Sequence, residues 1–257
     1  MLVRLRLIGG HVLATRLRAL ADVARQYGDG RVYLTTRANL QVRALPGRDG
    51  RLDADALAAL EATGLIPRPT HELVRNVMMS PQTGLAGGRA DLRRVGRDLD
   101  ALLCDDPRLS ALPGRFLFVL DDGRGDLIGR TCDLGAVALD GETAQLRVGA
   151  GWGRRVALAD AAAALADLAG RFVDARGAGP GAAWHVSELA GPLTELQDPD
   201  PSLPEPAPAL AFGDVPGGRH VRVPESGLDA DAVAALTERS ESLIVTPWRG
   251  VLIPEEH

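Results

Sequence analysis

The chain has 257 residues, of which 46% are apolar and 25% are charged, a balance typical of a folded globular protein with one large or two smaller domains. All 29 basic residues are arginines, and the formal net charge is −5. This charge argues against a general nucleic-acid binder, because such proteins normally carry a basic excess or a basic stripe.

The N-terminal residues are interrupted by arginines and by Gly9-Gly10, which argues against a signal peptide. No apolar run reaches the roughly 18–20 residues of a membrane-spanning helix. We therefore expect a soluble, cytoplasmic protein that makes no membrane contact. The two cysteines, Cys104 and Cys132, predict no disulfide framework, and the histidine and cysteine spacings indicate no metal site.

The first segment is predicted to form a strand, a helix and two further strands. Val3, Leu5 and Leu7 alternate with arginines, the period of a half-buried strand. A helical apolar spacing follows from residue 13 to residue 23 and is broken by Gly28-Asp29-Gly30. Residues 31–45 are rich in β-formers and predict two short strands around a turn at 36–39, after which 53–63 reads as a short helix.

The middle of the chain predicts a different α/β region. Its expected elements are a helix over 91–103, a strand over 115–120, a tight hairpin turn at 121–126, strands over 136–139 and 144–148, and an alanine-rich helix over 156–173. The proline-rich stretch from Gln197 predicts a semi-rigid connector, because proline fixes φ and lacks an N–H donor.

The end of the chain repeats the plan of the beginning. An offset of 216 residues aligns seven positions without a gap, which place Leu5, Leu7, Gly10, Val12, Ala14, Leu17 and Leu20 on Val221, Val223, Ser226, Leu228, Ala230, Val233 and Leu236. After a shortening of five residues, Leu34-Thr35 falls on Val245-Thr246. Such strand–helix units are common enough for a chance match. We nevertheless expect a duplicated half-domain, because each unit would expose an apolar sheet face until it is paired.

Five motifs in order resemble the nitrite/sulfite reductase family. Three are typical of the family as a whole: YGDGRVYLTTRANLQVR from Tyr27, VRNVMMSPQTG from Val74, and LPGRFLFVLDDGRGD from Leu112. Two later stretches, AWHVSEL and TPWRGVLIP, resemble its precorrin-3B synthase branch. The resemblance implies an α/β fold in which two ferredoxin-like half-domains pair around a pseudo-two-fold, with a central sirohaem- and cluster-domain-like α/β region.

The expected domain division follows from the repeat and the resemblance. Its segments are a first half-domain over 1–68, a central domain over 69–195, a connector over 196–212 and a second half-domain over 213–257.

The resemblance also implies site residues. Arg37 would face a tetrapyrrole, and Arg75 and Arg115 would complete the catalytic set, since guanidinium groups hold carboxylates in a bidentate manner. The predicted cofactor-binding residues are Arg37, Gln41, Arg43, Arg75, Asn76 and Arg249. Each has a structural alternative: an exposed edge arginine at position 37, a turn brace at Asn76, and an outward-pointing strand residue at Arg115.

Two positions carry weaker expectations. Arg249 lies with Trp248 where the second copy matches Arg37-Ala38 of the first. A lone histidine, His185, could be an axial ligand or a proton donor but is more often structural.

Two departures from the family pattern bear on function. The sulfite-reducing branch has two lysines on the Leu-Pro-x-x-Phe strand, where this chain has Arg115 and Leu117, so one cation is lost and reduction of a small oxyanion is disfavoured. The cysteine-rich motifs that bind a four-iron cluster are also missing, and two cysteines cannot supply four thiolates.

We therefore expect a precorrin-3B synthase-like oxidoreductase of cobalamin biosynthesis. It would bind sirohaem or a precorrin, and a 4Fe-4S cluster would have to come from a separate cluster-bearing polypeptide; a homo-oligomer is also compatible with the sequence. The alternatives are a non-catalytic tetrapyrrole-binding or scaffolding relative and a gene fragment.

Overall fold

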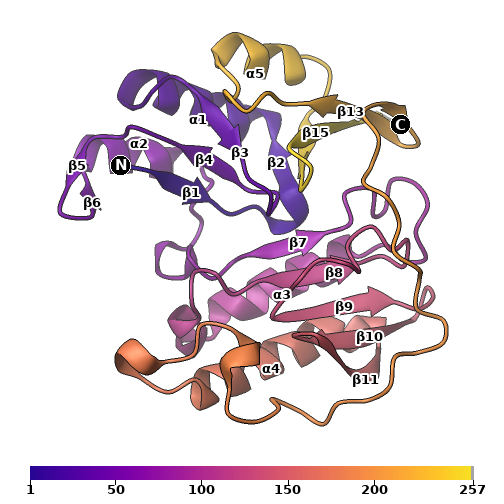
Figure 1. Ribbon diagram of the computed structural model, residues 1–257. Helices are drawn as coiled ribbons and strands as arrows, with labels where there is room; N and C mark the ends of the chain where they lie inside the picture. The colour runs from indigo at the N-terminus through magenta and orange to yellow at the C-terminus, as the bar shows by residue number, and fades with distance from the viewer. Residues whose placement is uncertain (256–257) are drawn as a thin grey trace. The chain divides into compact units, whose positions relative to one another are not determined.

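The computed structural model describes residues 1–255, which form two compact units. The first unit combines residues 1–72 with the described part of 210–257, and the second spans residues 73–209 (Figure 1). The chain therefore leaves the first unit, builds the second from one continuous stretch, and returns. The four-segment domain division stays a prediction.

The first unit contains two copies of one β–α–β–β arrangement. The first copy consists of β1 (Val3–Leu5), α1 (Ala14–Tyr27), β3 (Val32–Leu34) and β4 (Leu40–Val42). The second consists of β13 (Gly218–Arg222), α5 (Ala230–Leu236), β14 (Ser242–Thr246) and β15 (Gly250–Pro254). The last strand lies between the other two in both copies, with the antiparallel orders β1-β4-β3 and β13-β15-β14. The predicted fold of paired half-domains is thereby confirmed.

Each copy contributes a short segment that pairs with an edge strand of the other copy. Strand β2 (His11–Leu13) of the first copy pairs antiparallel with β14 of the second, with Val12 opposite Leu243. In return, Leu228 of the second copy pairs with Val32 on β3, through N–H···O bonds of 2.8 Å in both directions. The two pairings are equivalent under the repeat. Leu228 is the counterpart of Val12 at the offset of 216 (228 − 12), and Leu243 is the counterpart of Val32 at the offset of 211 that follows the five-residue shortening (243 − 32). Each copy thus covers the edge strand that the other leaves open.

The hairpin turns of the two copies also share a geometry. The Asn39 N–H donates to Thr35 Oγ1 at 3.1 Å, and the Gly250 N–H donates to Thr246 Oγ1 at 3.2 Å. The residue before each donor, Ala38 or Arg249, has a φ of 56°, in the left-handed region. The same turn is therefore built twice, 211 residues apart, from two segments that share the accepting threonine and differ in the residues after it.

Buried residues from both copies form one core. Helices α1 and α5 pack against each other (Figure 1), and Leu17, Leu20 and Val233 from these helices belong to the same buried cluster as Leu5 and Val245 from the strands. The remaining elements are α2 (Ala54–Ala62) beside α1, the hairpin of β5 (Gly47–Arg48) and β6 (Arg51–Leu52), and β12 (Gly213–Val215) at the edge of β13.

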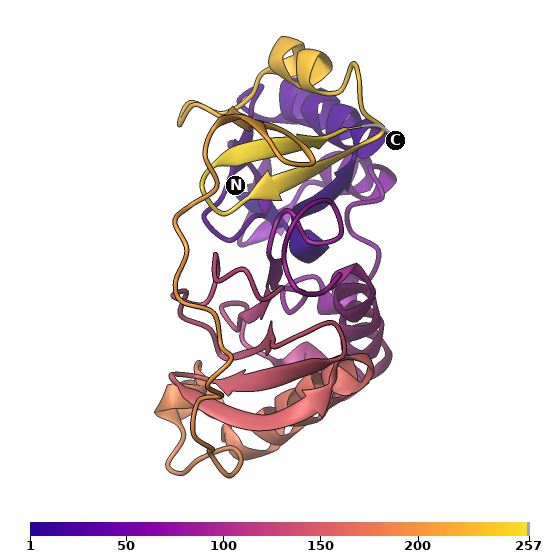
Figure 2. The ribbon, with the colours of Figure 1, turned by 90° about the vertical axis from the view of Figure 1, so that its right-hand side faces the viewer.

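The second unit is a five-stranded mixed sheet with its two helices on one face (Figure 2). Its strands, in the order β11-β10-β9-β8-β7, are β7 (Val77–Met79), β8 (Phe118–Asp121), β9 (Leu134–Ala138), β10 (Thr143–Val148) and β11 (Gly151–Ala157). Its helices are α3 (Arg93–Asp105) and α4 (Ala161–Ala175). Among the described residues of the whole chain, no helix combines the length and apolar character needed to cross a membrane.

Two local predictions in this unit are wrong. Residues 121–126 do not form a hairpin turn, because β8 and β9 are parallel. The Asp121 carboxylate instead accepts three backbone N–H bonds, from Gly123, Gly125 and Leu127, and these close the chain into a loop. The helix predicted from residue 156 begins only at residue 161, because residues 151–157 pair with β10 as an additional strand.

The backbones of the two copies approach each other closely at Gly10. Its φ is +77°, and a Cβ atom at this position would lie 2.0 Å from the Val245 carbonyl oxygen of the second copy. Gly10→Ala should lower the free energy of unfolding by about 2–4 kcal/mol, through steric overlap and backbone strain. Gly30→Ala is the matched control, because Gly30 has a φ of +81° but no atom within 4 Å, and it should cost only about 1 kcal/mol. Urea-induced unfolding followed by circular dichroism would measure both losses, and equal losses would contradict the close approach.

Candidate functional site

A cavity of about 290 Å³ in the first unit is lined by both copies of the repeat. The first copy contributes Tyr33, Leu34 and Arg43, and the second contributes Val223, Pro224, Glu225 and Arg249. Two residues that the sequence marked as cofactor-binding, Arg43 and Arg249, therefore lie on one cavity, although 206 positions separate them (249 − 43). Because residues of both copies form its wall, this cavity depends on the pairing of the two copies.

Arg43 is held in place by two neighbours from its own copy. Its guanidinium carbon lies 3.7 Å from the centre of the Tyr33 ring, in a cation–π contact. With the Gln41 amide turned so that its oxygen faces Arg43, Arg43 Nε and Nη2 donate to that oxygen at 2.6 and 3.2 Å. Tyr33 in turn donates its hydroxyl to Asp29 at 2.8 Å, a bond that raises the pKa of Tyr33 above its ordinary value. Gln41, which is buried, thus orients the arginine at the cavity wall.

Arg249 projects from the β14–β15 turn and is ion-paired with Glu225 through Nη1. Both partners are exposed to solvent, with 47% of the Arg249 side chain and 86% of the Glu225 side chain accessible. The left-handed φ of Arg249 suits glycine or asparagine better than arginine. The arginine side chain at this position is therefore not explained by the needs of the turn.

Arg37 lies in the β3–β4 turn and is half-buried. Its N–H is directed at Thr35 Oγ1 at 3.3 Å, while Asn39 in the same turn accepts the Leu7 N–H on its side-chain oxygen at 2.9 Å. This second bond ties the segment after β1 to the turn. Arg6, which directly precedes Leu7, is only 8% exposed. Sequence reasoning missed Arg6 because it treated this arginine as the polar position of an alternating strand, whereas buried cations are uncommon.

Arg75 and Asn76 lie in the second unit, just before β7, and both are buried. Arg75 Nε and Nη2 donate to the two carboxylate oxygens of Asp100 on α3, at 2.6 and 3.0 Å. The Asn76 side-chain amide donates to the Phe116 carbonyl oxygen at 3.2 Å, and the Asn76 backbone carbonyl accepts the Phe118 N–H at 2.9 Å. These contacts favour the bracing role for Asn76. They also mean that the Nε–Nη2 edge of Arg75, which could bind a ligand carboxylate, is occupied by Asp100.

Asp133, a carboxylate that sequence reasoning missed, bonds to the backbone two residues after Arg115 and to the His185 segment. The buried Asp133 carboxylate accepts the N–H of Leu117 at 2.9 Å and the N–H of Val186 at 3.0 Å, and His185 Nδ1 lies 3.2 Å from it. It therefore joins the residues just before β8 to the segment that carries His185. Arg115 is exposed, whereas the Leu117 side chain is buried at 6% exposure. Of the two positions that match the lysines of the sulfite-reducing branch, only Arg115 can thus offer a positive charge to a ligand.

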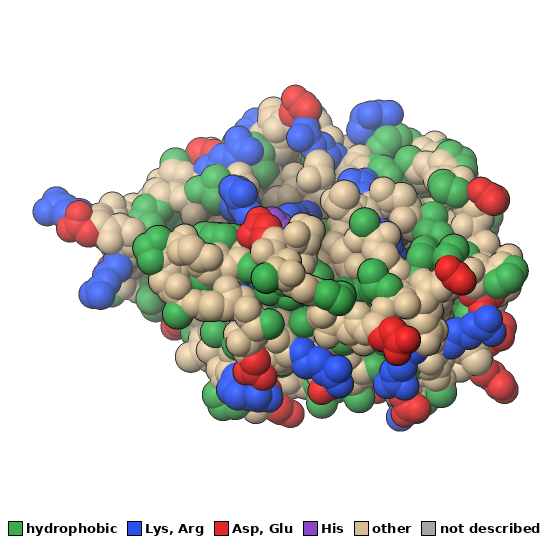
Figure 3. Space-filling model, turned by 60° about the horizontal axis from the view of Figure 1, so that its bottom comes forward, with side chains coloured by type: hydrophobic (Ala, Val, Ile, Leu, Met, Phe, Trp, Pro, Cys, Tyr) green, Lys and Arg blue, Asp and Glu red, His purple; other side chains and the backbone are tan. Residues whose placement is uncertain are grey.

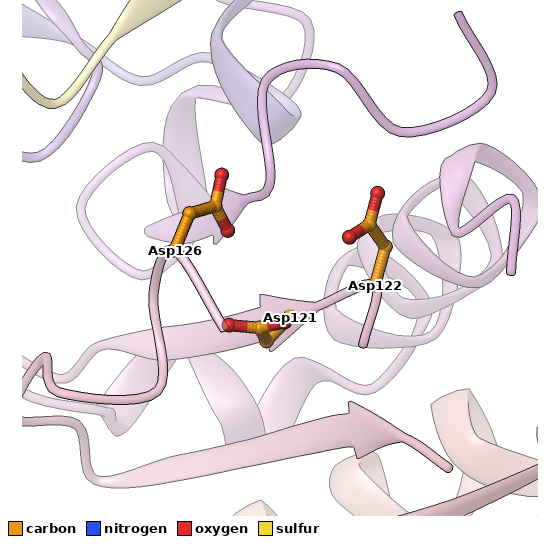
Figure 4. Close-up of side chains that lie close together, drawn as sticks. All are labelled: Asp121, Asp122 and Asp126. Carbon is orange, nitrogen blue, oxygen red and sulfur yellow. The ribbon is translucent and has the colours of Figure 1, made fainter. Parts of the chain in front are cut away.

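Three aspartates gather around the loop after β8 (Figure 4), and carboxylate oxygens of Asp121, Asp122 and Asp126 lie within 4.8 Å of one another. Each carboxylate already has a protein partner. Asp121 accepts the three backbone bonds described above, Asp122 is paired with Arg124 at 2.7 Å, and Asp126 accepts the Ser80 hydroxyl at 2.6 Å. Burial raises the pKa of Asp126 to about 7. The cluster is therefore satisfied as a loop-forming network.

The cysteines do not form a cluster-binding set. Four thiolates are the usual requirement for an iron–sulfur cluster, and the sequence holds two cysteines. Burial raises the pKa of the Cys132 thiol to about 11, which disfavours the thiolate that a metal requires.

The arginines on the face shown in Figure 3 are dispersed among carboxylates and do not gather into a broad basic patch. Ion pairs such as Arg108–Asp106 and Arg171–Asp167 are typical of the surface. On this face, an anionic ligand would therefore meet individual arginines rather than a continuous basic surface.

Asp126 should make the stability of the second unit depend on pH. Its pKa in the folded state lies above the ordinary value of 3.8, so the folded state binds more protons than the unfolded state between about pH 4 and pH 7, and stability falls as pH rises through this window. Asp126→Asn should therefore stabilise the protein by roughly 2–4 kcal/mol at pH 8 and by little at pH 4. Denaturant unfolding at the two pH values would measure this. The exposed Asp98→Asn should leave the pH dependence unchanged, and a pH-independent effect of Asp126→Asn would refute the assignment.

Residues 1–59, which contain β1, α1, β3 and β4, match the family described as nitrite/sulfite reductase ferredoxin-like half domain. The ferredoxin–nitrite reductase of Synechococcus elongatus is 31% identical over 134 residues, covering 49% of this chain and 26% of that protein. The ferredoxin–nitrite reductase of Leptolyngbya laminosa is 31% identical over 122 residues, covering 45% of this chain and 23% of that protein. The chain thus matches about a quarter of the length of these relatives.

The solved structure of the Mycobacterium tuberculosis NirA protein has the same fold. It superposes with a TM-score of 0.74 at 17% identity and covers 99% of this chain and 53% of that chain. These findings confirm the predicted resemblance to the nitrite/sulfite reductase half-domain family and the predicted fold. The assignment to the precorrin-3B synthase branch stays a prediction.

Proposed function

We propose that this chain binds a carboxylate-rich tetrapyrrole and contributes the tetrapyrrole-binding part of a precorrin-3B synthase-like oxidoreductase. The observation that carries the proposal is the convergence of Arg43 and Arg249, from two different copies of the repeat, on one cavity. Guanidinium groups bind carboxylates through charge-assisted hydrogen bonds, and precorrins and sirohaem carry several carboxylate arms.

The size of the cavity indicates which part of such a ligand would enter it. A volume of about 290 Å³ lies at the lower end of the range for small-molecule sites, so it suits a carboxylate-bearing edge of the macrocycle. Leu34, Val223 and Pro224 would contact the apolar part of that edge, while Arg43 and Arg249 would bind the carboxylates. Arg37 is proposed as a further cation toward the ring.

Sirohaem, when bound, would supply redox-active iron, and the residues of this chain would bind and orient its carboxylate arms. An iron–sulfur cluster does not fit the two cysteines of this sequence. Electron transfer through a cluster would therefore require ligands from a further segment or another polypeptide.

Nitrite reduction is the second candidate, because the relatives that match this chain are ferredoxin–nitrite reductases. Residues 115–117, just before β8, support nitrite reduction less well. Reduction of a small oxyanion favours dense positive charge beside the iron, whereas Leu117 is apolar and buried and only Arg115 is cationic. Oxidation of a precorrin, whose charges lie on peripheral arms, places its main demand on arginines around the ring.

A titration with uroporphyrin, a tetrapyrrole with eight carboxylates, would test the proposed site. Arg249→Asn keeps a residue that tolerates the left-handed turn, and Arg43→Gln keeps a polar side chain; each should weaken binding roughly tenfold or more, because a charge-assisted hydrogen bond is lost. Arg219→Gln is the control, since Arg219 is an exposed arginine of the same unit away from the cavity lining. Fluorescence of the porphyrin would report binding, and equal affinities for all variants would contradict the proposal.

Anaerobic reconstitution with ferrous iron and sulfide would test the need for external cluster ligands. We expect the chain alone to retain far fewer than four irons, because two cysteines cannot satisfy the cluster and the Cys132 thiol resists ionisation. Iron and sulfide analysis after desalting would measure this. Retention of four irons that is lost in Cys104→Ser and Cys132→Ser would show that the chain holds a cluster by itself.

A further inference from the structure

A carboxylate of the protein itself occupies part of the proposed ligand site. Glu225 lines the cavity beside Arg249 and is ion-paired with its guanidinium group. The chemistry of this contact is the one that a ligand carboxylate would make. An incoming carboxylate and Glu225 therefore compete for the same donor.

The backbone holds Glu225 at this position from both sides. The Gly227 N–H donates to the Pro224 carbonyl oxygen at 3.0 Å, which closes a turn around Glu225. Beyond the turn, Leu228 is paired with Val32 of the other copy, and Arg31 donates to the Gly227 carbonyl oxygen at 3.2 Å. The turn is thus anchored while the Glu225 side chain stays 86% exposed and can swing away.

The ion pair is weak enough to be displaced. Exposed pairs contribute little because water screens them and two long side chains must be ordered. The buried Arg75–Asp100 pair of the second unit contrasts with it, because 7% and 24% of those side chains are accessible. A ligand with one carboxylate would exchange one weak contact for another, whereas a ligand that engages Arg43 and Arg249 together would gain a second contact.

We propose that Glu225 competes with ligand carboxylates for Arg249 and so lowers the affinity of every carboxylate there, with the result that only a ligand that also engages Arg43 binds tightly. This inference rests on the proposed function for the identity of the ligand. It concerns Arg249, Glu225 and Arg43 alone, and can be tested with small carboxylates as well as with a macrocycle.

The experiment compares the wild-type chain with Glu225→Gln and with Asp229→Asn. Asp229 is the matched control: it is a half-exposed carboxylate four residues away, it pairs with Arg31, and asparagine preserves its capping of α5. The probes are uroporphyrin, followed by fluorescence, and propionate, followed by the ¹⁵Nε signal of Arg249. Glu225→Gln should bind both probes about two- to fivefold more tightly, and Asp229→Asn should change neither affinity. The gain in uroporphyrin affinity should disappear when Glu225→Gln is introduced into Arg249→Asn and compared with Arg249→Asn alone.

The outcomes separate this inference from the proposed function. If uroporphyrin binds the wild type, Glu225→Gln and Asp229→Asn equally, Glu225 does not compete, although the tetrapyrrole site stands. If Asp229→Asn tightens binding as much as Glu225→Gln, the effect is one of net charge and the inference is overturned. If no protein binds uroporphyrin but propionate reaches Arg249 at lower concentration in Glu225→Gln, competition is supported and the tetrapyrrole proposal fails. If propionate shifts the Arg249 signal at the same concentration in both proteins, the competition is refuted.

Discussion

The first unit depends on a reciprocal exchange of backbone pairing between its two copies. Val12 of the first copy lies opposite Leu243, and Leu228 of the second lies opposite Val32. Without these pairings, β3 and β14 would each present an open edge, and the N–H and C=O groups of that edge would have no sheet partner. The shared core beneath α1 and α5 follows from this pairing, since the buried cluster combines side chains of both copies. Neither copy is complete without the other.

The candidate site is a consequence of the same arrangement. One wall of the cavity comes from the edge of β3 and the end of β4, and the other from the turn after β13 and the β14–β15 hairpin. Duplication provided two equivalent turns with a left-handed residue, and the two have diverged in side chain. Ala38 is buried in one copy, whereas Arg249 reaches solvent in the other. A symmetric scaffold thereby carries an asymmetric distribution of charge.

The sequence predicted those parts of the fold that depend on local pattern. The repeat at an offset of 216 residues and the strand–turn–strand pattern at 31–45 were confirmed, because alternation and helical spacing survive in each copy. The loop at 121–126 was mispredicted, because its glycines and aspartates have hairpin chemistry, while the parallel course of β8 and β9 is set by tertiary pairing. Strand β11 was missed, because the apolar residues of Val156 onward continue smoothly into the alanine-rich helix.

The site was predictable only in part for a similar reason. Arg43 and Arg249 were singled out from motifs, but the partners that orient or occupy them, Tyr33 and Glu225, are brought to the cavity by the fold. Asp133 gave no sequence signal, since a single aspartate before a strand is common and its three contacts come from distant segments. The role of Arg75 was likewise hidden, because its partner Asp100 lies 25 positions away on a helix.

The position of the second unit within the chain has a consequence for the order of folding. Residues 73–209 are continuous, so all their sheet partners are synthesised before the chain returns to the first unit. Strand β2, in contrast, waits for β14, whose paired residue Ser242 is 229 positions after Leu13 (242 − 13). Contacts of such long sequence separation form slowly, and the unpaired edges are exposed to wrong partners in the meantime. During synthesis on the ribosome, the edge that β2 later shares with β14 therefore stays unpaired and open to wrong partners until the β14–β15 hairpin has emerged.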